Sequence, residues 1–219
     1  TWADAERGFE RALELDPNDA YTLLNYSLYL SNMGKHDEAI AEAKRALELD
    51  PLSIDINACL GWIFYIARHY DRAIEQYQTA LEMSPDFIPA SYNLAMSYAG
   101  KDMYSEAFAE VQKGIEHSGG EHPLLKSALV ILYSLMGRRD EAMKVLQNII
   151  ELSEQKYIDP YNMASIYTSL GKKDQAFEWL EKAYEERSAG LPQIKVEPMF
   201  DSLRSDPRFI AMLKKMNLE

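Results

Sequence analysis

Apolar residues recur at three- and four-residue spacing in short segments separated by turn signals. Within residues 20–33, one face of a predicted helix carries Leu23, Tyr26, Ser27 and Leu30. Gly34 can end this helix in a left-handed conformation. A second helical pattern follows, and Asp50-Pro51 ends it because a residue before proline is disfavoured in helical geometry. The pattern therefore predicts two consecutive helices joined by a tight turn.

The two-helix pattern repeats along the chain. Alanines fall 34 residues apart at positions 5, 39, 73 and 107, and two more follow at 142 and 176. Near-identical segments end at Pro17, Pro51 and Pro85. Self-similarity at this period indicates an array of helix pairs, and such arrays usually bind other molecules instead of catalysing reactions.

The repeat divides the chain into units. Residues 1–190 form the predicted array: a second helix without its partner in 1–18, then units at about 19–52, 53–86, 87–121, 122–155 and 156–190. Residues 191–219 do not repeat the pattern. Asp206-Pro207 is a good helix start, and the apolar stripe after it carries Phe209, Ile210, Leu213 and Met216. We expect this segment to cap the last unit.

These positions resemble the tetratricopeptide repeat (TPR). The resemblance rests on large–small pairs such as Leu60-Gly61 and Leu94-Ala95, on the repeated alanines and on the closing prolines. It implies an all-α, right-handed superhelix, an α-solenoid of antiparallel helix pairs whose first helices line the concave side. The fourth unit departs from the pattern, since Leu129-Val130 replaces the large–small pair and an extra residue lies within 117–122.

The tail carries a second, shorter resemblance. Residues 195–209 are similar to a segment that follows TPRs in multidomain bacterial regulators. This similarity implies a C-terminal module of a larger regulatory protein. The start at Thr1, halfway through a repeat, agrees with that expectation.

Composition narrows the partners. The net charge is −12 and acidic residues outnumber basic ones 35 to 23, which argues against nucleic acid as a ligand. A neutral, apolar or basic protein segment suits this charge better. Cys59 is the single cysteine, so the chain forms no internal disulfide, and we expect a cytoplasmic location. We expect no membrane association, because no segment is apolar over the length of a membrane span.

Candidate chemistry is sparse. The four histidines stand in or near different turns, and only His117 and His122 are close in sequence, without further metal ligands beside them. Cys59 falls within a predicted helix and is expected to be a small buried residue. No phosphate-binding loop or catalytic motif occurs. We therefore expect no cofactor, no metal and no enzymatic activity in this segment.

The predicted concave face is the candidate binding site. Placing the first helices on the superhelix directs a mixed set of apolar, aromatic and amide side chains into the groove: Asn25, Leu28, Trp62, Tyr65, Tyr92, Asn93, Met96, Ile131, Tyr161 and Asn162, with Leu24 beside them. Asparagines at equivalent places can donate to and accept from a peptide backbone. The aromatic side chains could equally pack between helices. The groove does not suit a clamp for a C-terminal carboxylate, because Ala58, Leu24 and similar residues replace its basic side chains.

The sequence therefore predicts a non-catalytic scaffold that binds a peptide or protein segment in the groove. Two alternatives remain open. The array could be the substrate-recognition arm of an enzyme whose catalytic domain precedes Thr1. Alternatively, the unpaired helix in residues 2–15 could dock on another copy and make a homo-oligomer.

Overall fold

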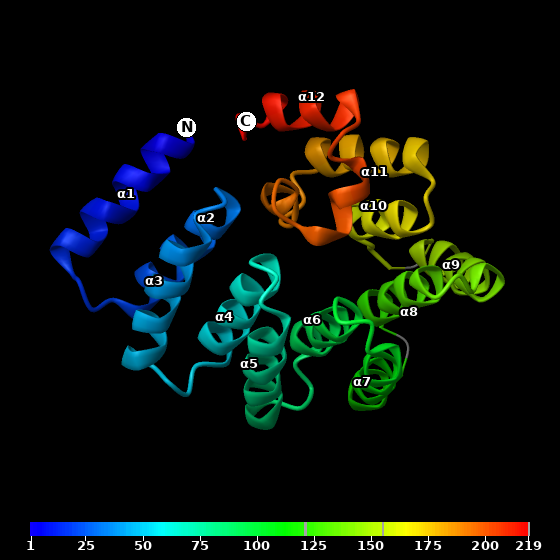
Figure 1. The fold of residues 1–219 in the computed structure, drawn as a ribbon, viewed down its shortest axis with the longest axis horizontal. Coiled ribbons are helices and arrows are strands. Elements are labelled where there is room, and N and C mark those ends of the chain that lie inside the picture. The colour runs from blue at the N-terminus through cyan, green and yellow to red at the C-terminus, as the bar shows by residue number, and fades with distance from the viewer. Residues whose placement is uncertain (121, 155, 219) are drawn as a thin grey trace.

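A computed structural model describes residues 1–120, 122–154 and 156–218, and these residues form helices without strands (Figure 1). The repeat array contains α1 (Trp2–Leu15), α2 (Ala20–Asn32), α3 (His36–Leu49), α4 (Ile54–Ile66), α5 (Tyr70–Met83), α6 (Ile88–Ala99), α7 (Tyr104–His117), α8 (Pro123–Leu135), α9 (Arg139–Ser153), α10 (Pro160–Ser169) and α11 (Lys173–Glu185). The tail contains two 3₁₀ helices and one α-helix: η1 (Leu191–Gln193), η2 (Pro198–Leu203) and α12 (Pro207–Lys215). Residues 121, 155 and 219, on which two expected units and the tail end, lie outside the described residues.

Consecutive helices pair and stack into one curved array (Figure 1). The pairs are α2 with α3, α4 with α5, α6 with α7, α8 with α9, and α10 with α11. First helices also contact one another along the array, as α2 does with α4 and α4 with α6. The predicted all-α superhelix with a C-terminal capping helix is therefore confirmed.

Local chemistry fixes where the helices begin and end. The carboxylate of Asp19 accepts a hydrogen bond from the backbone N–H of Tyr21 at 3.1 Å, and Ser53 Oγ caps α4 through the N–H of Ile56 at 3.3 Å. Gly34 follows α2 with φ +82°, the left-handed geometry that the sequence predicts. These caps satisfy backbone groups that a helix leaves unpaired at its ends.

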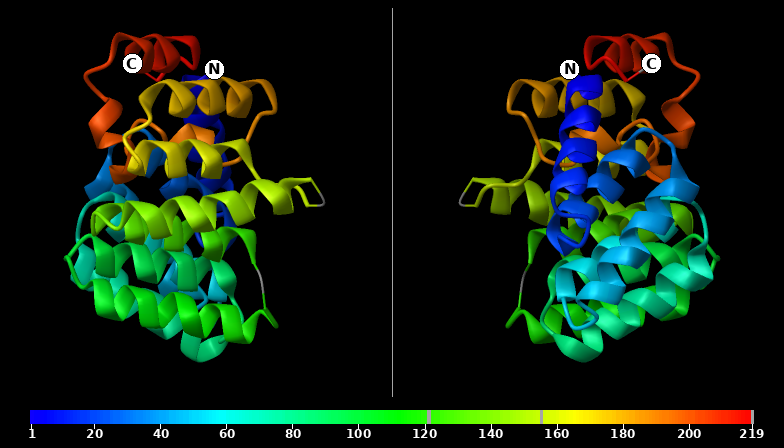
Figure 2. Two further views of the ribbon diagram at one scale, coloured as in Figure 1. Left: turned by 90° about the vertical axis from the view of Figure 1, so that its right-hand side faces the viewer. Right: turned by 90° about the vertical axis from the view of Figure 1, so that its left-hand side faces the viewer.

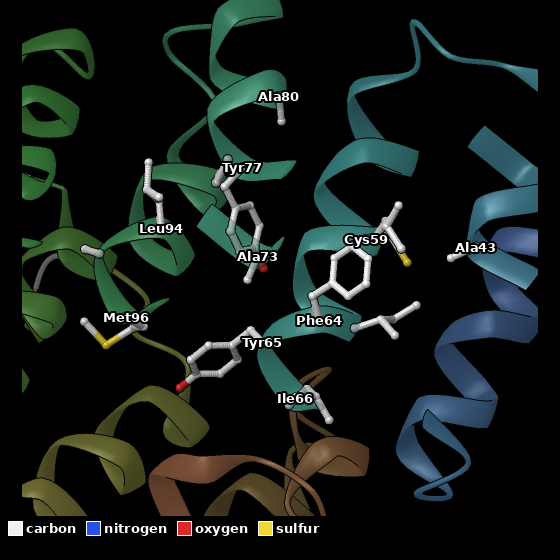
Figure 3. Packing of buried hydrophobic residues seen from close by; sticks show 14 of the residues in the cluster. Ala43, Cys59, Phe64, Tyr65, Ile66, Ala73, Tyr77, Ala80, Leu94 and Met96 are labelled. Atoms are coloured by element: carbon white, nitrogen blue, oxygen red, sulfur yellow. The ribbon is translucent and has the colours of Figure 1, made fainter. Parts of the chain in front are cut away.

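Small residues make the close joints between helices. The alanines at the repeated position are fully buried: Ala39, Ala73, Ala107, Ala142 and Ala176. At Gly61, an added Cβ would lie 2.9 Å from the ring of Tyr77, which is also fully buried (Figure 3). The small member of the large–small pair is thus required by the aromatic ring of the next helix in the pair.

The apolar core consists of two clusters that meet at α8. Ile131 belongs to the cluster built on α2–α8, whereas its neighbour Val130 belongs to the cluster built on α9–α12. This division falls in the unit whose sequence departs from the repeat pattern. Two glycines with positive φ, Gly119 and Gly120, precede that unit.

The tail helix α12 caps the array by packing on α11. Its buried face requires one correction, because Ile210 is 56 % exposed and Met212 is buried beside Phe209. Residues 209, 212, 213 and 216 follow the helical spacing of three and four, and Ile210 lies about 100° away from them. The Arg208 guanidinium lies 4.1 Å above the ring of Phe177 on α11.

Between α11 and α12, the chain crosses the inner side of the array. Val196 and Met199 pack against the core cluster of the first units. Beyond this crossing, the indole Nε1 of Trp2 donates to the carbonyl of Met216 at 2.8 Å, so the two ends of the chain meet (Figure 2). The superhelix therefore closes on its own tail.

Candidate functional site

The concave face encloses a cavity of about 630 Å³. First helices and the tail contribute its lining: Leu28 from α2; Ala58, Cys59, Trp62 and Tyr65 from α4; Phe87, Pro89, Tyr92, Asn93 and Met96 at α6; Leu124 from α8; Asp159, Tyr161, Asn162 and Ser165 at α10; and Ala189, Gly190, Gln193, Glu197 and Met199 from the tail. A cavity of this size lies within the usual range for ligand pockets.

The tail divides the concave face into two hollows. A second hollow of about 360 Å³ lies across η2 and includes Pro198, Asp201 and Ser202 in its lining. Tyr65, Met96 and Met199 line both hollows. The tail therefore occupies the middle of the groove and leaves space on either side.

Polar contacts hold the tail in this position. The Tyr65 hydroxyl donates to Glu197 Oε1 at 3.0 Å, and the Arg68 guanidinium pairs with Asp201 at 2.6 Å. Figure 3 shows the Tyr65 ring projecting from α4 toward the C-terminal part of the chain. Arg204 donates to the carbonyls of Lys195 and Glu197, the latter at 3.1 Å. These contacts stabilise a segment that has little regular backbone hydrogen bonding of its own.

Glu197 is the dominant charge in the groove. Its side chain is buried, with the residue 6 % exposed, and burial raises the pKa of its carboxyl group to about 7. Hydrogen bonds from the Tyr65 hydroxyl and the Met199 N–H oppose that shift without cancelling it. Burial first, and then the nearby Glu197 carboxylate, raises the pKa values of Tyr65, Tyr92 and Tyr161.

Aromatic rings form much of the cavity wall. Trp62 stacks on Tyr65 with ring centroids 5.4 Å apart, and Tyr161 meets Phe200 edge-on at 5.3 Å. Within the described part of the chain, two buried polar atoms of this wall have no hydrogen-bond partner: Trp62 Nε1 and Tyr161 Oη. The wall thus offers both apolar surface and unpaired polar groups.

The predicted groove residues separate into three groups. Those that line the cavity and stay partly exposed are Leu28, Trp62, Tyr92, Asn93 and Asn162. Those that line it but are buried are Tyr65, Met96 and Tyr161. Those outside the lining are Asn25, Leu24 and Ile131.

The last group has clear physical reasons for its position. Ile131 is fully buried in the core between helices, and Leu24 is also buried. The Asn25 amide donates to the backbone carbonyl of Tyr21 in its own helix at 2.8 Å. The expected row of asparagines therefore reaches the cavity at Asn93 and Asn162 only.

The sequence interpretation missed the tail residues of the cavity. Gln193, Glu197 and Met199 line it from residues that we expected to cover only the end of the array. One signal was present in the sequence: Glu197 is an acidic residue within an otherwise apolar run around Val196 and Met199. A charged residue in such a position often has a specific partner.

The site carries no recognisable nucleophile or metal centre. Cys59 is buried, its Sγ lies 3.8 Å from Ser27 Oγ, and burial raises the pKa of its thiol to about 12. Within the described residues, no group of three or more potential ligands is placed to hold a metal ion. Across the same part of the chain, no helix has the length and apolarity to cross a bilayer.

Family models match three parts of the chain. Each is described as a tetratricopeptide repeat, and the matched ranges are 9–41, 60–121 and 161–189. Together, these ranges cover more than half of the sequence. No curated protein matches the chain by sequence.

Solved structures provide a second comparison. A crystal structure of MamA is 25 % identical, covers 70 % of this chain and 90 % of its own, and has a TM-score of 0.58. A tetratricopeptide repeat protein from Parabacteroides merdae ATCC 43184 is 20 % identical, with coverage of 99 % of this chain and 86 % of its own and a TM-score of 0.60. TTC0263, a thermophilic TPR protein of Thermus thermophilus, is 19 % identical, with coverage of 89 % and 99 % and a TM-score of 0.60. The last two similarities support the fold alone.

Proposed function

We propose, from the premise that this chain belongs to the tetratricopeptide repeat family, that it is a scaffold binding a protein segment in its concave groove. The TPR fold and its structural neighbours support a protein-interaction scaffold in general. The assignment of the groove as the binding surface is our own step. It rests on how the chain uses that surface itself.

One observation carries the proposal: an irregular segment of this same chain already lies in the groove. Residues 194–203 pack apolar side chains on the first units and place Glu197 against the hydroxyl of Tyr65. The groove is therefore suited to a polypeptide that contributes both apolar and hydrogen-bonding groups. A partner segment would use the partly exposed side chains beside the tail, including Trp62 and Tyr92.

Peptides selected from a displayed random library against the immobilised protein would test this proposal. We expect the combined substitution Trp62→Ala and Tyr92→Ala to weaken the selected peptides by at least about 30-fold, since aromatic anchors often cost about 2 kcal/mol or more on truncation. Tyr21→Ala is the matched control, because Tyr21 is 71 % exposed and lies outside the cavity lining. Equal affinity for the double variant and the original protein would refute the groove assignment.

The finer parts of the proposal have their own support. Membership of a larger, bacterial regulatory protein rests on the resemblance of residues 195–209 to tails that follow TPRs in such proteins. A cytoplasmic location rests on the use of a single, buried cysteine. We propose a non-catalytic role because the cavity combines aromatic, amide and carboxylate groups without an activated nucleophile.

The oligomer alternative is less favoured by the contacts of α1. Phe9 packs its ring on Tyr26 and Tyr29, and Trp2 bonds to the tail of the same chain. The apolar side of α1 is thus used within the chain. Sedimentation that shows a concentration-dependent dimer would favour the alternative again.

A further inference from the structure

We propose that the larger cavity of the concave face binds one organic cation of side-chain size, the ammonium group of a lysine in the partner segment. This inference rests on the proposed function, because it specifies the chemistry of the segment that the groove receives. It depends on the charge, the rings and the unpaired groups around the cavity.

The charge of the cavity favours a cation. Its lining contains the carboxylates of Glu197 and Asp159, and none of the lining residues is Lys, Arg or His. Tyr65 Oη and the Met199 N–H reach one oxygen of Glu197, Oε1, at 3.0 and 3.4 Å. The Arg204 guanidinium binds the main-chain carbonyl of Glu197 and pairs with the carboxylate of Asp201 instead. The buried carboxylate is therefore placed to accept a cation from a ligand.

The aromatic side chains favour a cation as well. Ring faces carry partial negative charge and attract ammonium groups, with the largest effect where water is excluded. Trp62, Tyr65, Tyr92 and Tyr161 line the same cavity as the carboxylate. This combination of rings and one carboxylate suits an ammonium group on an apolar stem.

The unpaired polar atoms fit the rest of a lysine residue. Tyr161 is 9 % exposed and its hydroxyl has no partner, so its oxygen can accept one of the three ammonium N–H groups. The unpaired Trp62 Nε1–H is a donor only, and it suits the carbonyl of a peptide backbone. The volume of about 630 Å³ accommodates a lysine side chain together with part of its backbone.

A direct test uses n-butylammonium, which reproduces the lysine side chain, and 1-pentanol, a neutral molecule of similar size and shape. The probe is titrated into the full chain at constant ionic strength and about pH 8, while NMR follows the indole N–H signals. We expect the Trp62 signal to shift and saturate with n-butylammonium and to require at least tenfold more 1-pentanol. Equal affinities for the two probes would overturn the inference.

Variants locate the binding on the carboxylate. Glu197→Gln keeps the shape and an acceptor for Tyr65 but removes the charge, and we expect it to weaken n-butylammonium at least tenfold. Glu75→Gln makes the same change at an exposed position on α5 and is the matched control, with unchanged binding. Tyr161→Phe removes one hydroxyl and is expected to weaken binding three- to tenfold, which keeps the test valid if Glu197→Gln fails to fold. Unchanged affinity in the folded variants would contradict the inference.

Binding should also follow the ionisation of Glu197. Other charged or titratable groups near it are Tyr65 on α4, Tyr92 on α6, Tyr161 and Asp159 at α10, and Asp201 and Arg204 in the tail. Of these, the Glu197 carboxyl has its pKa at about 7. We expect n-butylammonium to bind roughly tenfold more weakly at about pH 6 than at about pH 8, because protonation removes the charge it pairs with. Binding that does not change over this range would contradict the assignment to Glu197.

The two proposals can fail separately. If the selected peptides need Trp62 and Tyr92 but n-butylammonium does not bind, the cation site is wrong and the peptide groove remains. If n-butylammonium binds through Glu197 but the selected peptides ignore Trp62 and Tyr92, the cation site remains and the peptide groove is wrong.

Discussion

Tyr65 on α4 donates its hydroxyl proton to Oε1 of Glu197 at 3.0 Å, across 132 positions of sequence. Both side chains are buried. The bond connects the second complete repeat unit to the tail and divides the concave face into two hollows. It thereby links the stability of the tail to the shape of the binding site.

Removal of this hydroxyl should destabilise the fold. We expect Tyr65→Phe to lower the free energy of unfolding by about 1–3 kcal/mol, because a buried carboxylate loses its side-chain donor. The loss should be larger at about pH 8 than at about pH 5, since the ionised carboxylate is the stronger acceptor. Denaturant unfolding at the two pH values measures this difference. Tyr21→Phe is the control, and a Tyr65→Phe variant as stable as that control would contradict the assigned bond.

Glu197 should make stability depend on pH. Its pKa is about 7 in the folded chain, against an ordinary value of 4.5, so the folded chain holds a proton that the unfolded chain releases. The corresponding stabilisation is fully present below about pH 4.5 and is lost as the pH rises through about 7, by about 3 kcal/mol in total.

The variant Glu197→Gln removes this titration. We expect it to be more stable than the original protein at about pH 8 and to lose the decline in stability between about pH 5 and about pH 8. Thermal or denaturant unfolding across that range provides the comparison. Parallel pH profiles of the two proteins would show that Glu197 titrates normally.

Two glycines in helices should respond oppositely to the same substitution. Gly61→Ala places a methyl group 2.9 Å from the Tyr77 ring and should cost about 1–3 kcal/mol through overpacking. Gly8→Ala in α1 meets nothing within 4 Å and should stabilise by about 0.5–1 kcal/mol, since alanine is the better helix former. Unfolding free energies of both variants decide the point, and a shift of the same sign in both would contradict the packing of α4 on α5.

Arg204 should hold the tail in the groove. Its guanidinium donates to the carbonyls of Lys195 and Glu197 and lies 5.9 Å from the ring of Phe209. We expect Arg204→Ala to increase amide hydrogen exchange in residues 191–203 while leaving α4 and α6 protected. Arg139→Ala, an exposed position on α9, is the control. Unchanged exchange in the tail of the Arg204 variant would show that other contacts position it.

The repeat array could be predicted because its determinants are local and recur. Ala39 and Ala73 mark one joint after another, and the side chain after Gly61 must point away from that joint, which directs Trp62 into the groove. Each inference used a few neighbouring residues and the helical period.

The tail could not be predicted in the same way. Its path depends on contacts between distant residues, such as Tyr65 with Glu197, that have no repeated counterpart. Two 3₁₀ helices also interrupt any helical periodicity, and the stripe at the chain end is ambiguous because Ile210 and Met212 are both apolar. Only the packing of α12 on α11 decides which of the two is buried.

The most direct test of the binding groove is an NMR titration that follows the three tryptophan indoles, Trp2, Trp62 and Trp179, during addition of a selected peptide. Trp62 lines the cavity, whereas Trp2 contacts the tail end and Trp179 lies on α11. We predict a saturating shift of the Trp62 indole signal with little change at Trp179. A saturating shift at Trp179 with an unmoved Trp62 signal would contradict binding in the concave groove.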